Sequence, residues 1–202
     1  MRGIYAIVDA EHSSDLASLV ATLLEAGIRL VQYRAKSGVD RDLVRALRAR
    51  TLAAGASLVV NDDLEAALEA DGLHVGQADL TRFAPLDLRT LLGGRLLGIS
   101  AATPEEARRA ESIGADYLGV GPFAATSSKA DARRPIGVAG VRAVVLATHV
   151  PVAAIGGIEL ENLAQVAASG AAMAASIAAV ARGTPAGSEA RALVERWAEL
   201  TR

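Results

Sequence analysis

The alternation of structural elements is clearest in residues 3–33, which read GIYAIVDAEHSSDLASLVATLLEAGIRLVQY. The short apolar run at residues 3–8 predicts a buried strand. Residues 15–26 predict a helix that ends at Gly27, a residue type common just past a last helical turn. A second apolar run at residues 28–33 predicts the next strand. This strand–helix–strand order is typical of parallel sheets that are covered by helices.

The same order continues to the end of the sequence. Thr103 and Pro104 fit the N-cap and the first position of one of the later helices. The further strands are expected at residues 58–60, 73–75, 96–99, 117–120, 152–155 and 171–177. The further helices are expected at residues 40–54, 63–70, 104–113, 138–147, 160–168 and 188–200.

Eight strands, each followed by a helix or a segment of helix length, predict a closed (β/α)₈ TIM barrel. No linker or low-complexity stretch interrupts the 202 residues, so we expect one domain over residues 1–202. An open, doubly wound parallel sheet is the alternative architecture, because it is built from the same repeating unit.

The composition excludes several classes of protein. Hydrophobic residues make up 51% of the chain and charged residues 22%, which excludes extended disorder. The net charge of −2 argues against a nucleic-acid binder with a basic surface. The absence of cysteine excludes disulfides and thiolate chemistry. Without a membrane-length apolar run or a signal-peptide pattern, we expect a cytoplasmic enzyme or binding protein with no membrane partner.

Polar residues cluster where the predicted strands end, and in a barrel these ends form one rim. Gln32, Arg34 and Lys36 alternate after the second strand, a pattern that favours binding of an anion such as a diphosphate. Asp62 and Asp79 follow the third and fourth strands and could bind Mg²⁺ between the protein and phosphate oxygens. Plainer interpretations remain open: a solvated strand end for the first group, and a helix cap for Asp62.

Other polar residues allow a functional and a structural interpretation. Asp63 fits the cap of the helix that follows it. His74 ends an apolar run, where a hydrogen-bonded core or rim histidine is the more common role. The hydroxyl-rich loop around Lys129 fits a phosphate contact or a surface turn. The pair Gly156-Gly157 fits a backbone phosphate site or a tight turn.

Taken in order, these segments resemble the thiamine-phosphate synthase (thiamine-phosphate pyrophosphorylase) family over residues 5–180. Each segment is a modest signal alone, and their order makes the resemblance specific. The segments are Val31-Gln32-Tyr33-Arg34-Ala35-Lys36, Val60-Asn61-Asp62-Asp63, the run from Asp71 to Asp79 (DGLHVGQAD), the run from Gly114 to Pro122 (GADYLGVGP), and Ala154-Ile155-Gly156-Gly157-Ile158.

The resemblance implies a reaction and a set of residue roles. A Mg²⁺-dependent transferase would couple 4-amino-2-methyl-5-(diphosphooxymethyl)pyrimidine with a thiazole phosphate through a pyrimidine-methyl cation, giving thiamine phosphate and diphosphate. The aminopyrimidine diphosphate would contact Gln32, Arg34, Lys36, Asn61, Ser100 and Lys129, of which Arg34, Lys36, Ser100 and Lys129 would be catalytic. The thiazole phosphate would contact Thr126, Ser128, Gly157, Ile177 and Ala178. Mg²⁺ would bind Asp62 and Asp79.

The sequence departs from the family pattern in a few places. Ser128 replaces a usual threonine, which keeps the hydroxyl, whereas Ala178 stands where a serine is common and loses one. The family often has proline at the position of Ala125. A run with Met173 replaces the usual Gly-Ala-Asp-Gly-Val, and the segment between Asp62 and Asp71 is about two residues short. Weaker binding of the thiazole phosphate would follow from the lost hydroxyl.

Three other functions fit parts of the sequence. A thiazole tautomerase on the same barrel typically lacks part of the diphosphate and metal set, and often has histidine where this chain has Pro122. A non-catalytic phosphate-binding regulator would not need Asp62 and Asp79. Another phosphate-handling barrel enzyme would share the Gly156-Gly157 site but not the Gln-x-Arg-x-Lys segment. The oligomeric state stays open, with a homodimer among the options.

Overall fold

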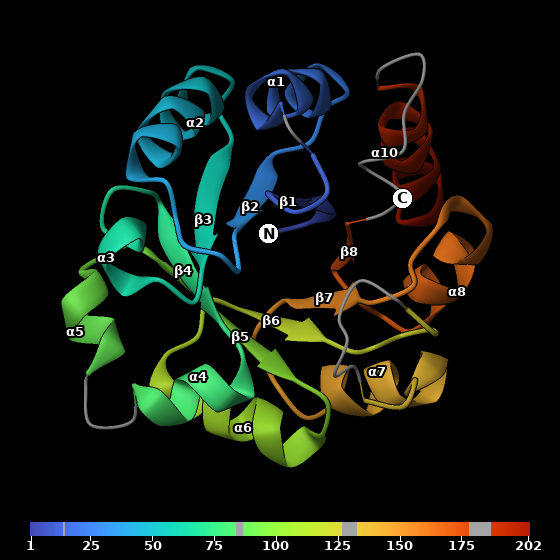
Figure 1. The fold of residues 1–202 in the computed structure, drawn as a ribbon. Helices are drawn as coiled ribbons and strands as arrows, with labels where there is room; N and C mark the ends of the chain where they lie inside the picture. Colours follow the sequence, from blue (N-terminus) through green and yellow to red (C-terminus); the bar gives the residue numbers. More distant parts are fainter. Residues whose placement is uncertain (14, 84–86, 127–132, 178–186) are drawn as a thin grey trace.

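The computed structural model describes residues 1–13, 15–83, 87–126, 133–177 and 187–202 (Figure 1). These residues form eight parallel strands that pair in sequence order, and the last strand pairs with the first to close a barrel. The strands are β1 (Gly3–Asp9), β2 (Leu30–Arg34), β3 (Ser57–Asn61), β4 (Gly72–Val75), β5 (Leu96–Ala101), β6 (Tyr117–Val120), β7 (Val152–Ile155) and β8 (Met173–Ser176). The predicted (β/α)₈ barrel is confirmed, and the open sheet is excluded.

Helices surround the strands on the outside of the barrel (Figure 1). They are α1 (Leu16–Glu25), α2 (Arg41–Ala53), α3 (Leu64–Ala67), α4 (Gln77–Arg82), α5 (Leu88–Leu92), α6 (Pro104–Ile113), α7 (Gly137–Val145), the 3₁₀ turn η1 (Leu160–Asn162), α8 (Leu163–Ala168) and α10 (Ser188–Leu200). The bounds of α6, β6, β7 and α10 match the sequence predictions. The short helices α4 and α5, both between β4 and β5, were not predicted.

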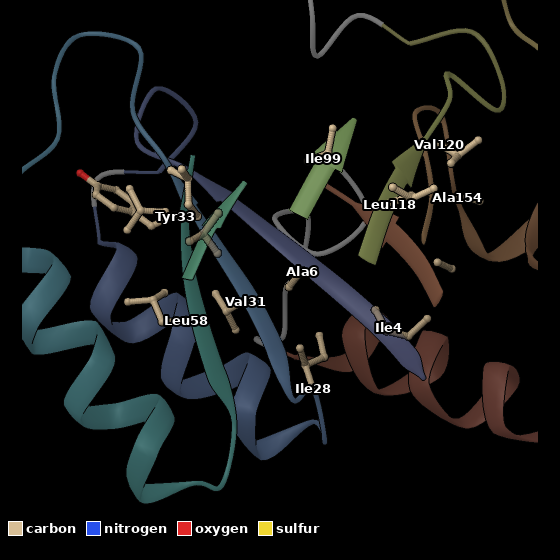
Figure 2. Close-up of a cluster of buried hydrophobic side chains, with 14 of the residues drawn as sticks. Ile4, Ala6, Ile28, Val31, Tyr33, Leu58, Ile99, Leu118, Val120 and Ala154 are labelled. Carbon is tan, nitrogen blue, oxygen red and sulfur yellow. The ribbon is translucent and has the colours of Figure 1, made fainter. Parts of the chain in front are cut away.

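Side-chain alternation along the strands separates two cores. On β1, Ile4 and Ala6 pack outward into the large cluster between the strands and the helices (Figure 2). Tyr5 and Ile7, the residues that alternate with them, pack into a second cluster inside the barrel. The inner cluster comprises Tyr5, Ile7, Leu30, Val59, Tyr117, Ala153, Met173 and Ala175. Every second residue of a strand faces the barrel interior. The inward-facing residues nearest the carboxyl ends of the strands therefore lie closest to the rim.

Two aspartates clamp the amino-terminal face of the barrel. Asp71 precedes β4, and its Oδ2 accepts the backbone N–H of Leu58 on β3 at 2.9 Å. Asp116 precedes β6 and accepts the N–H of Leu97 on β5 in the same way at 2.7 Å. An arginine from the helical layer also contacts each carboxylate. These contacts satisfy strand-end donors that would otherwise lack a partner.

Glycines on β5 and β6 make room for two large polar side chains inside the barrel. A Cβ added at Gly98 would lie 2.2 Å from Cζ of Tyr117 and 2.5 Å from Nδ1 of His74. A Cβ added at Gly119 would lie 2.9 Å from Cε1 of His74. The rings of His74 and Tyr117 therefore occupy space that any other residue at these two positions would fill.

We predict that Gly98→Ala lowers the free energy of unfolding by about 2 kcal/mol, because the added methyl group overpacks a closed interior. Gly94→Ala is the matched control, since a Cβ there meets nothing within 4 Å. Urea denaturation would measure both variants, and the control should stay within about 0.5 kcal/mol of the wild type. Equal stability of the two variants would contradict the predicted overlap.

Candidate active site

The carboxyl ends of β1 and β2 form a buried ion pair. Register pairs Asp9 with Arg34, and the guanidinium Nη1 donates to Oδ2 of Asp9. The side chain of Asp9 is 0% exposed and that of Arg34 is 14% exposed. Burial alone would raise the pKa of the Asp9 carboxyl, but hydrogen bonds from the Glu11 N–H and from Arg34 outweigh burial and hold this pKa below its ordinary value. Asp9 therefore carries a negative charge that fixes Arg34 at the rim.

Lys36 lies beyond the end of β2, so the expected strand alternation does not extend to it. Its side chain is exposed, and Nζ lies 3.6 Å from Oε2 of Glu11. Glu11 follows β1 as Lys36 follows β2, so this second pair continues the buried pair of Asp9 and Arg34 into solvent. Lys36 reaches the same rim as Arg34, but on a loop.

Gln32 lies deeper than Arg34, inside the barrel. Its side chain is buried, and Nε2 donates a hydrogen bond to Oη of Tyr5. Tyr5 Oη lies 2.8 Å from Oη of Tyr117, and Tyr117 Oη lies 3.0 Å from Nδ1 of His74. The other ring nitrogen of His74 lies 3.0 Å from Oγ of Ser100. The structure thus places Gln32 and Ser100 at the two ends of one polar network.

His74 is buried within this network, as the more common role of such a histidine suggested. Tyr5 and Tyr117 were not singled out from the sequence. Burial raises the pKa of both tyrosine hydroxyls above their ordinary value, although hydrogen bonding with Tyr117 and with Gln32 partly offsets this rise for Tyr5. Both hydroxyls therefore stay neutral.

Asp62 and Asp79 both flank Gly76. Oδ1 of Asp62 accepts the N–H of Gly76 at 3.1 Å, and a Cβ added at Gly76 would lie 3.7 Å from Oδ2 of Asp79. Arg82 spans the two residues, with Nη2 donating to the carbonyl of Asp62 and Nη1 3.8 Å from Oδ1 of Asp79. Both aspartates thus lie next to Gly76 and Arg82, and their convergence on one metal ion stays a prediction.

Asp62 has an uncommon backbone conformation. Among the described residues, it alone outside glycine has a positive φ, 58°. Aspartate and asparagine tolerate this region better than most residues, and strained backbone often occurs at functional sites. Asn61 donates its side-chain amide to Oδ2 of Asp62. Asp63 caps α3 by accepting the N–H of Ala66, so the structural interpretation of Asp63 is confirmed.

The loops after β6 and β7 pair with each other. The N–H groups of Phe123 and Ala124 donate to the carbonyls of Ile155 and Gly156. A Cβ added at Gly157 would lie 2.5 Å from the carbonyl oxygen of Ala125, so glycine permits this close approach. The pairing thus places Ala124 and Ala125, the two residues before Thr126, against Gly157. Ile177 packs against the inner cluster at the end of β8. Ser128, Lys129 and Ala178 lie outside the described residues.

Within the described ranges, no group of three or more His, Asp or Glu side chains could hold a metal ion by itself. The pair Asp62 and Asp79 supplies two carboxylates. This donor set suits Mg²⁺, which commonly uses one or two protein carboxylates together with water and substrate phosphates. No helix within those ranges is long and apolar enough to cross a membrane.

The closed eight-stranded barrel places the chain in the class of (β/α)₈ proteins, and the comparisons with known proteins identify the family. The family model for thiamine monophosphate synthase matches residues 4–180. The chain belongs to this family.

Relatives from bacteria and archaea carry the same name. The chain is 47% identical to a thiamine-phosphate synthase of Moorella thermoacetica over 88% of this chain and 86% of the relative. It is 39% identical to one of Archaeoglobus fulgidus over 95% and 91%. Among solved structures, a thiamine phosphate pyrophosphorylase from Pyrococcus furiosus has a TM-score of 0.88 and 30% identity, over 99% of this chain and 97% of the other.

We predict that Asp9→Asn lowers the free energy of unfolding by about 3 kcal/mol at neutral pH, because Arg34 then lacks its buried partner. The lowered pKa of Asp9 stabilises the fold above the unfolded-state pKa of roughly 4, and this contribution is lost as pH falls. The free energy of unfolding should therefore fall less steeply with decreasing pH in the variant than in the wild type. Glu11→Gln removes an exposed pair and should cost less than about 1 kcal/mol. Equal losses in the two variants would be inconsistent with a buried pair.

Proposed function

We propose that this chain is a thiamine-phosphate synthase. It would couple 4-amino-2-methyl-5-(diphosphooxymethyl)pyrimidine with a thiazole phosphate and release thiamine phosphate and diphosphate. The observation that carries the proposal is the rim: in a barrel of this family, Asp9 fixes Arg34 at the end of β2, and two carboxylates flank Gly76 after β4. An ordered cation and a pair of carboxylates on one rim suit a magnesium diphosphate.

Arg34 at the end of β2 and Lys36 on the following loop would bind the diphosphate group, together with Asn61 on β3. Arg34 is held by a buried partner, so it would offer its remaining N–H donors without first becoming ordered. Lys36 is exposed on a loop and would close onto the diphosphate as a mobile charge. Lys129 is proposed as a third cation from the family resemblance, since it lies outside the described residues.

Asp62 and Asp79 would hold Mg²⁺ against the diphosphate. When bound, the ion would neutralise diphosphate oxygens and make the diphosphate a better leaving group. Charge counting supports such a partner. Of the described residues discussed for this site, Arg34, Lys36 and Arg82 are cations, and Asp9, Glu11, Asp62 and Asp79 are carboxylates. These groups together carry no excess positive charge for a diphosphate, so binding should depend on Mg²⁺.

The residues present suit a dissociative reaction. The C–O bond between the pyrimidine methyl group and the diphosphate would break with its electron pair leaving on the diphosphate, and the thiazole nitrogen would capture the pyrimidine-methyl cation. Negative charge on the leaving group increases as this bond breaks. Arg34, Lys36 and Lys129 would therefore bind the transition state more tightly than the substrate. Such a step needs no protein nucleophile.

Gln32 and Ser100 would hold the pyrimidine ring within the mouth of the barrel. Thr126, Gly157 and Ile177 would surround the thiazole phosphate, because the pairing of the loops after β6 and β7 gathers this side of the rim. Ser128 and Ala178 are proposed for the same phosphate on the family resemblance. Both substrates are charged phosphate esters that do not cross membranes readily, which favours a cytoplasmic location for the enzyme.

We predict diphosphate release only when purified protein, Mg²⁺, the aminopyrimidine diphosphate and the thiazole phosphate are all present. A coupled diphosphate assay with each component omitted in turn would measure this, and thiamine phosphate should form in equal amount. Binding of the thiazole phosphate without any release would refute the synthase assignment and favour a tautomerase or a regulator.

We predict that Asp62→Asn and Asp79→Asn each lower kcat/KM on the order of a hundredfold at a fixed, limiting Mg²⁺ concentration, because each removes one charged ligand. Asparagine at position 62 keeps a residue type that tolerates the positive φ. Asp63→Asn is the matched control: it removes a neighbouring charge but keeps a good helix cap. Calorimetry should also show that Mg²⁺ and inorganic diphosphate each strengthen binding of the other in the wild type and not in Asp79→Asn. Near-normal turnover of either aspartate variant would argue against a metal role.

A further inference from the structure

A line of hydrogen bonds crosses the interior of the barrel and joins side chains from five strands. Gln32 on β2 contacts Tyr5 on β1, which contacts Tyr117 on β6 at 2.8 Å. Tyr117 contacts His74 on β4, and His74 contacts Ser100 on β5, each at 3.0 Å. The two tyrosine rings meet edge to face, with centroids 5.5 Å apart. Both rings are fully buried, so water cannot replace any of their contacts.

The chemistry of the Gln32 amide sets the direction of every proton along this line. An amide nitrogen only donates, so Tyr5 Oη accepts from Gln32. The hydroxyl proton of Tyr5 then has Tyr117 as its acceptor. The reverse direction would leave the Tyr5 proton buried without an acceptor, which is costly. Tyr117 therefore donates to Nδ1 of His74, and Nε2–H of His74 donates to Oγ of Ser100.

We propose that this line holds His74 as the Nε2–H tautomer and thereby sets Ser100 as a hydrogen-bond donor to the substrate. Within the described structure, neither the hydroxyl proton of Ser100 nor Oε1 of Gln32 has another partner. The two ends of the line therefore present one donor and one acceptor. A 4-aminopyrimidine carries the complementary pair: an exocyclic amine that donates and a ring nitrogen that accepts.

The proposal rests on the proposed function and explains how the site would recognise the pyrimidine ring of the substrate. Tyr5, Tyr117 and His74 are positioning residues, because they act on the substrate only through Gln32 and Ser100. A 4-oxo pyrimidine with the same diphosphate would present an acceptor where Oε1 of Gln32 also accepts. In a complex with the 4-oxo pyrimidine, Oε1 of Gln32 would be buried without a hydrogen-bond donor. This cost makes the site prefer the 4-amino pyrimidine.

Two glycines support the positions of His74 and Tyr117 in this line of hydrogen bonds. Gly98 and Gly119 leave room for the rings of His74 and Tyr117, which any side chain at those two positions would displace. The raised pKa of both tyrosine hydroxyls keeps each of them a donor at every working pH. Neutral side chains thus connect the barrel interior to the pyrimidine site, while the charged groups lie at the rim.

The tautomer of His74 can be measured without turnover. The chain has three histidines, and the other two, His12 and His149, have exposed side chains. In the full-length protein labelled with ¹⁵N-histidine, the proposal expects a one-bond ¹H–¹⁵N coupling at Nε2 of His74 and none at Nδ1. A proton on Nδ1 would overturn it. His74→Gln identifies the signal.

Tyr117→Phe tests the function of the line, and Tyr33→Phe is its matched control. Tyr33 is as buried as Tyr117 but packs in the outer cluster between the barrel and the helices (Figure 2). We expect Tyr117→Phe to lower kcat/KM for the aminopyrimidine diphosphate at least tenfold, mainly through KM, with the KM for the thiazole phosphate unchanged. We also expect both tautomers of His74 to be populated in Tyr117→Phe. The ratio of kcat/KM for the amino substrate to kcat/KM for the 4-oxo analogue should decrease in the same variant.

The outcomes separate the two proposals. No diphosphate release by the wild type refutes the proposed function, while the tautomer of His74 still decides the direction of the line. An active wild type with a Tyr117→Phe variant that behaves like Tyr33→Phe overturns the inference and leaves the proposed function standing. Thermal melts of both variants establish that they are folded, and a Tyr117→Phe variant that does not fold leaves the tautomer measurement on the wild type as the decisive test.

Discussion

A polar atom inside a closed barrel is cut off from water and must find its partner in another strand. This constraint governs the interior of the molecule. The amide of Gln32 and the hydroxyls of Tyr5 and Tyr117 satisfy one another across the barrel axis, and the carboxylate of Asp9 is satisfied by Arg34 and a backbone N–H. Leaving any one of these groups unpaired would cost more than its hydrogen bond contributes. The partners therefore fix one another's positions. The proposed substrate site at the rim is ordered because these side chains are ordered.

The two kinds of polar contact have different electrostatic characters, and the barrel separates them by depth. The deeper line from Gln32 to Ser100 is made of amide, hydroxyl and imidazole groups, whereas the rim pairs Arg34 with Asp9 and Lys36 with Glu11. A substrate with an uncharged ring and a charged diphosphate matches this order, with the ring innermost.

Much of the fold could be predicted because the strand–helix alternation is regular and the helix signals are local. Thr103 and Pro104 marked the start of α6, and the apolar runs at β6 and β7 gave the bounds of these strands. The helix α4 was missed because it is six residues long and Gly76 provides no side-chain cap. Asp9 was missed because a single aspartate at the end of an apolar run looks like an ordinary strand end. Its role depends on register with Arg34, a contact between residues 25 positions apart. The network through Tyr5 and Tyr117 was missed for the same reason, since neither tyrosine differs from a core residue in sequence.

The clamps made by Asp71 and Asp116 lie at the opposite face of the barrel from every group discussed for binding. They tie strand starts to one another through backbone donors, so their contribution does not depend on which side chains occupy the rim. Part of the stability of the fold thus comes from the end of the barrel opposite to the proposed chemistry. Proteins that keep these two anchors retain this part of their stability when rim residues change. Such proteins can therefore acquire a new ligand during evolution without first acquiring new stabilising contacts.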